Sequence, residues 1–142
     1  MKVSLDIDKV QPGVEELLGL IDFLIPSVNF VRQFSGIQNW REGLLVLSEH
    51  TAGFVGVTRG SQGAAALWEG NLVEFSGIRV KCVDTTGAGD VFHGAFVYAL
   101  LENHSVGTCL RFANTAAALS CTRYGARGGI PPLEEVFSMM QD

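Results

Sequence analysis

A glycine-containing stretch at residues 84–90, with the sequence DTTGAGD, constrains the fold of this chain more than any other feature. It lies between an apolar run at residues 78–83, which predicts a strand, and an apolar run from Ala88 onward, which predicts a helix. Gly87 and Gly89 allow the backbone to turn tightly and to come close to a ligand. We therefore predict a strand, a turn and a helix in succession.

The predicted start of this helix is suited to bind an anion. The amide N–H groups of Gly87, Ala88 and Gly89 would lie where a helix has unpaired donors and the positive end of its dipole. Asp90 adds a carboxylate to the same turn. A hydroxyl that attacks a phosphate needs both, because the amides stabilise negative charge and the carboxylate accepts the proton. The structural alternative is that aspartate is common in the first turn of any helix.

Composition favours one folded domain without nucleic acid or membrane partners. The chain has 142 residues, of which 47% are hydrophobic and 18% charged. The net charge is −5, and no run of lysine and arginine offers a surface for nucleic acid. No apolar stretch reaches the ~18 residues that cross a bilayer. Acidic residues interrupt the N-terminus, which therefore does not resemble a signal peptide, and we expect a cytoplasmic protein.

The cysteines, Cys82, Cys109 and Cys121, are odd in number and far apart in the sequence. Their spacing matches neither a zinc site nor a disulfide framework. We therefore expect buried free thiols in a reducing compartment.

The hydrophobic pattern alternates strands with helices, continues with a hairpin-like β section and ends with helices. Predicted strands cover residues 2–7, 22–25, 53–58, 63–68, 71–75 and 79–83. Predicted helices cover residues 13–20, 29–34, 40–50, 88–101, 106–122 and 133–140. This order favours a three-layer α/β fold with a mostly parallel sheet.

The longer string at residues 84–94, DTTGAGDVFHG, closely resembles the signature near the C-terminus of ribokinase-like (PfkB-type) carbohydrate kinases. The resemblance implies that Asp90 is the catalytic base, which removes a proton from the sugar hydroxyl that attacks the γ-phosphate of ATP. It also implies that the backbone of Gly87, Ala88 and Gly89 forms the anion hole.

The resemblance covers nearly the whole chain, but only the C-terminal half of the family's domain, because members of the family run to roughly twice this length. Residues 1–142 are therefore predicted to be the nucleotide-binding half of a three-layer α/β/α ribokinase-like domain with a partly parallel sheet. The N-terminal half, which supplies most of the sugar site in the family, is missing.

Two further segments resemble the family's nucleotide site. In the TRGSQG segment, Thr58 and Gly60 would approach the ATP phosphates, and Gly63 would permit close backbone contact. The alternative is a plain glycine-rich hairpin turn. The FANTAA segment would bring Asn114 near the adenine. The alternative is a core asparagine whose amide is satisfied within the protein.

The loop after that second segment resembles the family's monovalent-cation site. The implied ligands are Asp84, Thr86 and the backbone carbonyls of Ser120, Arg123 and Gly125. A serine hydroxyl often completes this set in the family, whereas this chain has Gly129, which weakens the case for K⁺. The alternative role for Asp84 is a helix N-cap or a carboxylate that braces the loop.

The chain also departs from the family's Asn-x-x-Glu motif, which helps to position Mg²⁺ and phosphate. The aligned residues are Ser27 and Phe30, and a phenylalanine binds neither a metal nor its waters. Mg²⁺ would still arrive bound to ATP, so we expect an altered dependence on metal or phosphate.

The resemblance thus implies ATP-dependent phosphorylation of a sugar hydroxyl, with ATP and Mg²⁺ as cofactors and K⁺ as a further candidate. The expected partners are a small-molecule sugar and ATP, and a homodimer is one expected state. Two alternatives stay open. The first is a truncated, non-catalytic module that binds ATP or ADP, and the second is a structural or assembly role.

Overall fold

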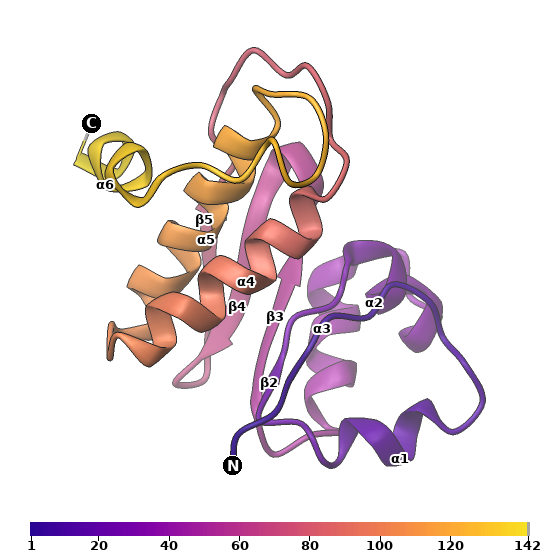
Figure 1. Cartoon of the computed structure of the whole chain (residues 1–142). Helices are drawn as coiled ribbons and strands as arrows, with labels where there is room; N and C mark the ends of the chain where they lie inside the picture. Colours follow the sequence, from indigo (N-terminus) through magenta and orange to yellow (C-terminus); the bar gives the residue numbers. More distant parts are fainter. Residues whose placement is uncertain (142) are drawn as a thin grey trace. The chain divides into compact units, whose positions relative to one another are not determined.

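The computed structural model describes residues 1–141, which divide into two compact units (Figure 1). The first unit comprises residues 1–59 and 64–74. The second comprises residues 60–63 and the chain from Phe75 onward.

Five strands form one sheet in sequence order. They are β1 (Ser4–Leu5), β2 (Phe23–Leu24), β3 (Phe54–Thr58), β4 (Gly63–Trp68) and β5 (Asn71–Ser76). β1, β2 and β3 are parallel, with Phe23 opposite both Ser4 and Phe54. β4 runs antiparallel to β3, with Ala65 opposite Val57. The sheet is therefore mixed and partly parallel, because helices connect the parallel strands whereas a tight turn connects the hairpin.

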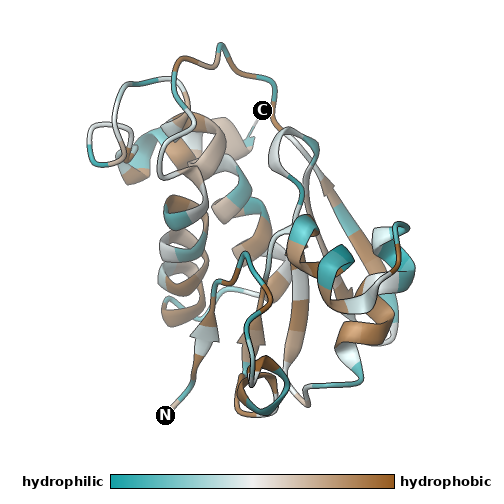
Figure 2. Cartoon of the chain, turned by 90° about the vertical axis from the view of Figure 1, so that its right-hand side faces the viewer, coloured by the Kyte–Doolittle hydropathy of each residue, from teal (hydrophilic) through white to brown (hydrophobic). Residues whose placement is uncertain are grey.

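Three helices complete the first unit: α1 (Val14–Leu18), α2 (Val28–Ser35) and α3 (Trp40–Ser48). The Ser27 side chain caps α2 by accepting a hydrogen bond from the Phe30 amide, and Gly36 ends the helix in a left-handed conformation. Phe30 and Leu44 are fully buried in the hydrophobic core that these helices share with β2 and β3. Figure 2 shows brown and teal bands on the helices, as expected for helices with one buried and one exposed face.

The second unit contains α4 (Ala88–Leu101), α5 (Val106–Ser120) and α6 (Leu133–Gln141). α4 packs along α5, and α6 also packs against α5 (Figure 1). The Phe112 ring of α5 lies 5.7 Å from the Tyr98 ring of α4 and 5.3 Å from the Phe137 ring of α6, measured between centroids. α4 buries Phe92 and Phe96 on the stripe that its apolar spacing predicts.

The predicted bounds agree with the structure at both ends for β4 and α4. Glu69 and Gly70 form the turn between β4 and β5, in the section predicted to be hairpin-like. Both turn residues have positive φ, 48° and 79°, as a two-residue hairpin turn requires. None of the helices within residues 1–141 is long and apolar enough to cross a bilayer.

The predicted strand at residues 79–83 is wrong, because this segment is irregular. The amides of Val83 and Asp84 donate to the Cys121 carbonyl at 2.7 and 3.2 Å. Their hydrogen-bond acceptor is therefore the C-terminal end of a helix and not a neighbouring strand. The first strand is also shorter than its predicted range, residues 2–7. The three-layer arrangement stays a prediction.

Candidate functional site

The turn before α4 leaves backbone donors open at the start of the helix. Gly87 is the N-cap and adopts a left-handed conformation, with φ 77° and ψ 5°. The Ala88 amide, which we predicted in the anion hole, donates to the Thr85 carbonyl at 3.1 Å. Within residues 1–141, no acceptor meets the amides of Gly87, Gly89 or Asp90. These open donors are suited to bind an anion at the positive end of the helix dipole.

Asp90 is the third residue of α4, and its side chain is exposed to solvent. The carboxylate is therefore not sealed beneath other side chains and can meet a ligand. Its position in the first turn places it on the same turn of backbone as the open amides. An exposed carboxylate and open backbone donors thus occur together, which is the combination that phosphoryl transfer to a hydroxyl requires.

Asp84 braces this turn against the loop after α5. Its Oδ1 accepts a hydrogen bond from the Thr86 amide at 2.9 Å, and its Oδ2 accepts one from the Gly125 amide at 2.8 Å. The Thr86 side chain, and then the Gly125 and Thr86 amides, lower the pKa of Asp84 below its ordinary value of 3.8. The structure therefore supports the loop-bracing role that was the alternative for this residue.

This brace predicts a dependence of stability on pH. Because the pKa of Asp84 is lower in the folded chain, its contribution is fully present above the ordinary value of 3.8 and is lost as pH falls through the lower folded pKa. We expect Asp84→Asn to lower the urea midpoint at neutral pH and to differ less from the parent chain in acid. Glu102→Gln, at the other end of α4, is the matched control. A difference that persists unchanged at the lowest pH would contradict this prediction.

Gly87 lies against the same loop. A Cβ atom at this position would lie 2.7 Å from the Ala126 Cβ, and its φ of 77° disfavours any other residue. Sequence reasoning did not identify Ala126, although a small residue within a glycine-rich loop is the signal that could have revealed it. The turn at residues 84–90 is therefore held to the loop by a hydrogen bond and by close packing.

Gly87→Ala should reduce the free energy of unfolding by about 2–4 kcal/mol, because it adds backbone strain to a steric clash. Adding Ala126→Gly should recover the part of the loss that is due to the clash but not the part due to φ. Urea denaturation of the two single variants and the double variant measures this coupling. Additive losses in the double variant would refute the proposed contact.

Part of the predicted cation site also converges in the second unit. The carbonyls of Ser120 and Gly125 lie 2.7 and 3.1 Å from the position that a Cβ of Gly129 would occupy. The Gly129 amide donates to the Gly125 carbonyl at 2.8 Å, and the Arg123 amide donates to the Ser120 carbonyl at 3.4 Å. A serine at position 129 would therefore collide with backbone. Among the described residues, no group of three His, Cys, Asp or Glu side chains could hold a metal ion.

The predicted nucleotide-binding turn divides between the two units. Thr58 ends β3 in the first unit, where its amide donates to the Pro26 carbonyl at 3.0 Å. The next residue, Arg59, lies 4.6 Å above the Trp40 ring and forms an ion pair with Glu74 at 3.2 Å. Arg59 is therefore held within the first unit by its own neighbours.

The close backbone contact that we predicted for Gly63 occurs with the chain itself. A Cβ on Gly63 would lie 2.1 Å from the Phe75 carbonyl oxygen, and φ is 91°. A Cβ on Gly77 would likewise lie 1.9 Å from the Ser61 carbonyl oxygen. Gly60, by contrast, has no atom within 4 Å of such a Cβ. The need for a glycine at position 63 is thus explained by the close approach of two backbone segments. A role for Gly63 in ATP binding stays a prediction.

Asn114 is buried on α5, and its Nδ2 donates to the Ser76 carbonyl at 2.8 Å. This contact satisfies the amide within the protein and ties α5 to the end of β5, as the structural alternative requires. A contact with adenine stays a prediction.

The two residues that replace the Asn-x-x-Glu motif have structural roles in the first unit. The Ser27 Oγ donates to Asp8 at 2.5 Å and accepts from the Phe30 amide at 3.2 Å. Phe30 is fully buried, and its ring stacks on Phe34 with centroids 5.7 Å apart. Position 30 therefore serves the core and cannot present a ligand to a metal.

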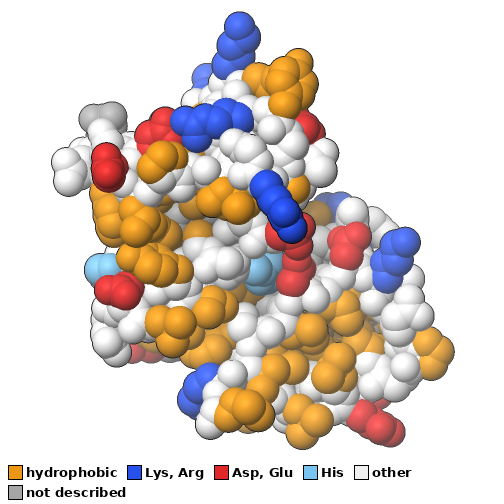
Figure 3. All heavy atoms as spheres, in the orientation of Figure 1, with side chains coloured by type: hydrophobic (Ala, Val, Ile, Leu, Met, Phe, Trp, Pro, Cys, Tyr) orange, Lys and Arg blue, Asp and Glu red, His pale blue; other side chains and the backbone are white. Residues whose placement is uncertain are grey.

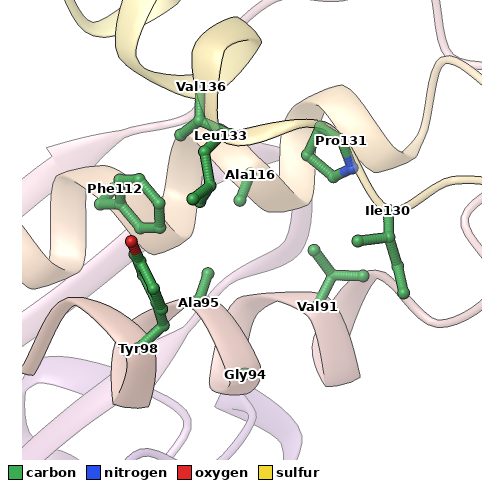
Figure 4. Close-up of a pocket in the computed structure, with 10 residues that line it drawn as sticks. All are labelled: Val91, Gly94, Ala95, Tyr98, Phe112, Ala116, Ile130, Pro131, Leu133 and Val136. Atoms are coloured by element: carbon green, nitrogen blue, oxygen red, sulfur yellow. The ribbon is translucent and has the colours of Figure 1, made fainter. Parts of the chain in front are cut away.

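The second unit also has an apolar groove of about 200 Å³ between α4, α5 and the segment that enters α6 (Figure 4). Tyr98 carries the one polar side-chain group among its lining residues, and its ring points toward Phe112. Figure 3 shows hydrophobic side chains gathered over these helices. The groove offers no charged side chain for a phosphate. It is therefore not suited to hold the anion that the open amides of α4 could bind.

The sequence model of the pfkB family carbohydrate kinases matches residues 2–133. The chain belongs to the PfkB family. The ribokinase of Haemophilus influenzae is 34% identical over 99% of this chain and 48% of its own length. The ribokinase of Arabidopsis thaliana is 34% identical over 98% of this chain and 39% of its own length.

Solved structures of ribokinases share the fold. The ribokinase of Thermotoga maritima superposes with a TM-score of 0.87 at 32% identity, over 98% of this chain and 49% of that chain. Arabidopsis ribokinase, solved with ribose and ATP, superposes with a TM-score of 0.85 at 30% identity, over 99% of this chain and 48% of that chain. An E. coli structure named a ribokinase II, solved with ATP and Mg²⁺, superposes with a TM-score of 0.82 at 30% identity, over 90% of this chain and 42% of that chain. The chain thus spans about half the length of the relatives it matches.

Proposed function

We propose that this chain is the C-terminal, nucleotide-binding half of a PfkB-type sugar kinase and that it supplies the turn at which phosphoryl transfer occurs. The observation that carries this proposal is that the exposed Asp90 side chain lies on the same turn as the open amides of Gly87, Gly89 and Asp90. The Arabidopsis relative, solved with ribose and ATP, supports a nucleotide and a sugar as the two reactants.

In the proposed reaction, the γ-phosphate of ATP faces the open amides at the start of α4. Asp90 accepts the proton of a sugar hydroxyl as its oxygen attacks phosphorus and the ADP oxygen leaves. The amides and the helix dipole stabilise the negative charge on the transferred group. The Asp84–Gly125 hydrogen bond keeps this turn in position and so contributes indirectly.

Metal ions would enter this scheme with the nucleotide. The E. coli relative, solved with ATP and Mg²⁺, supports Mg²⁺ carried by the phosphates. The chain has Phe30 where the family's motif has glutamate, so its own contribution to metal placement would be small. The converging carbonyls of Ser120 and Gly125 suit a monovalent cation, although both already accept hydrogen bonds.

Calorimetric titration with Mg·ATP, paired with a coupled ADP assay on ribose, tests the proposal. We expect saturable ATP binding together with turnover on a sugar. Binding without turnover on any sugar would support the second candidate, a non-catalytic module, which the buried Phe30 in place of the family's glutamate favours. A folded chain that binds neither ATP nor ADP would refute both.

A further inference from the structure

Two of the three cysteines, which are far apart in sequence, lie beside one another in the second unit. Cys82 is exposed in the irregular segment before α4, and Cys121 is half-buried at the C-cap of α5. The Val83 amide donates to the Cys121 carbonyl at 2.7 Å, and the Asp84 amide donates to the same oxygen at 3.2 Å. Figure 1 shows this segment and the end of α5 at the same end of the unit. Our expectation that all three thiols are buried is therefore wrong for Cys82.

These hydrogen bonds limit the separation of the two cysteines. Standard bond lengths and the Val83–Cys121 hydrogen bond together place the two Cα atoms at most about 7.5 Å apart. Disulfides usually span Cα separations of about 4.4–6.8 Å, so the backbones are close to or within that range. Burial, and then the neighbouring Cys82, raise the pKa of the Cys121 thiol, and a Cys82 side-chain hydrogen bond is among the causes. The backbone hydrogen bonds thus hold the two cysteines at a separation from which their side chains can be joined.

We propose that Cys82 and Cys121 form a reversible disulfide when the chain meets a peroxide. The exposed Cys82 thiolate attacks one peroxide oxygen, which gives a sulfenic acid and one water. The Cys121 sulfur then attacks the Cys82 sulfur, its proton leaves, and the sulfenic oxygen departs as a second water. Two thiols are oxidised and one peroxide is reduced, so the step balances.

Cys109 does not compete for this reaction. It is fully buried, burial raises the pKa of its thiol, and its sulfur contacts the His104 carbonyl at 3.6 Å. Cys121 instead is half-buried, its thiol donates to the Ala117 carbonyl at 3.3 Å, and its backbone is hydrogen-bonded to the residue next to Cys82. The disulfide is therefore selective for one pair.

The bond would close a loop that contains all of α4 and α5 and would tie the segment leading to Asp84 to the end of α5. It would stabilise the second unit by restricting the unfolded chain. It would also fix the entry to the turn at residues 84–90. The inference does not rest on the proposed kinase function, because its readout is a covalent bond.

The test treats the full 142-residue chain with a small excess of hydrogen peroxide, followed by alkylation of free thiols in denaturant. We expect the thiol count to fall from three to one, the intact mass to fall by two hydrogen atoms, and digestion to yield a peptide joining Cys82 to Cys121. Dithiothreitol should restore all three thiols. The oxidised monomer should also melt roughly 5 °C or more above the reduced one.

Single serine variants supply the controls. Cys109→Ser should still form the intramolecular bond, whereas Cys82→Ser and Cys121→Ser should not, and circular dichroism checks that each variant is folded. Three thiols that survive peroxide in the folded parent chain would overturn the proposal. So would a product confined to intermolecular dimers, or oxidation of Cys82 that leaves Cys121 free to alkylate.

Discussion

Replacing Asp90 with asparagine should lower turnover on a sugar by about 10²–10⁴-fold while leaving ATP affinity nearly unchanged. The side chain is exposed in the first turn of α4, so asparagine can occupy the same space without disturbing the helix. It cannot accept the hydroxyl proton. Loss of rate without loss of binding is the result expected for a general base.

The matched control is Glu102→Gln, which removes the same charge from the exposed C-cap of the same helix. A coupled ADP assay and calorimetry on both variants separate the catalytic role from a general effect of charge. Near-normal turnover in Asp90→Asn would refute the assignment. Equal losses in the two variants would point instead to the net charge of the helix.

Gly63→Ala should reduce the free energy of unfolding by about 3 kcal/mol or more. The new Cβ would lie 2.1 Å from the Phe75 carbonyl oxygen, and rigid backbone cannot yield as a flexible side chain does. The left-handed φ of 91° adds strain. Such a loss is a large fraction of the stability of a typical domain, and urea denaturation measures it directly.

Gly60→Ala is the control within the same turn. Its φ of 56° is also left-handed, but no atom lies within 4 Å of the added Cβ. We expect a loss of about 1–2 kcal/mol, which reflects φ alone. Similar losses for the two variants would show that the close approach of two backbone segments at Gly63 does not exist in solution. A Gly63 variant that stays folded but loses ATP binding would favour the nucleotide role predicted from the sequence.

Local patterns predicted the elements whose causes are local. The apolar stripe of α4 marks its buried face, and Glu69 and Gly70 supply the positive φ values of the hairpin turn. Gly36, just after the predicted helix at residues 29–34, likewise ends α2 in a left-handed conformation. These features depend on neighbours three or four residues away, which a single sequence displays.

Features that depend on distant partners were not predictable. Apolar residues at 78–83 predicted a strand, but hydrogen bonds to Cys121 take the place of a strand partner. The contact of Gly87 with Ala126 and the hydrogen bond from Asp84 to Gly125 join segments about forty residues apart. The sequence identified the residues of the candidate site through a family resemblance, and only the structure revealed what braces them.

The buried ring of Phe30 restricts how metal affinity could be engineered into this chain. A glutamate grafted at that position to restore the missing motif would point into an enclosed apolar core. Its carboxyl group would stay protonated there or would unfold the first unit, because an isolated charge is not tolerated in such surroundings. A new magnesium ligand would have to be placed at an exposed neighbouring position such as Asn29. The helix would then have to rotate so that this side chain faces the metal.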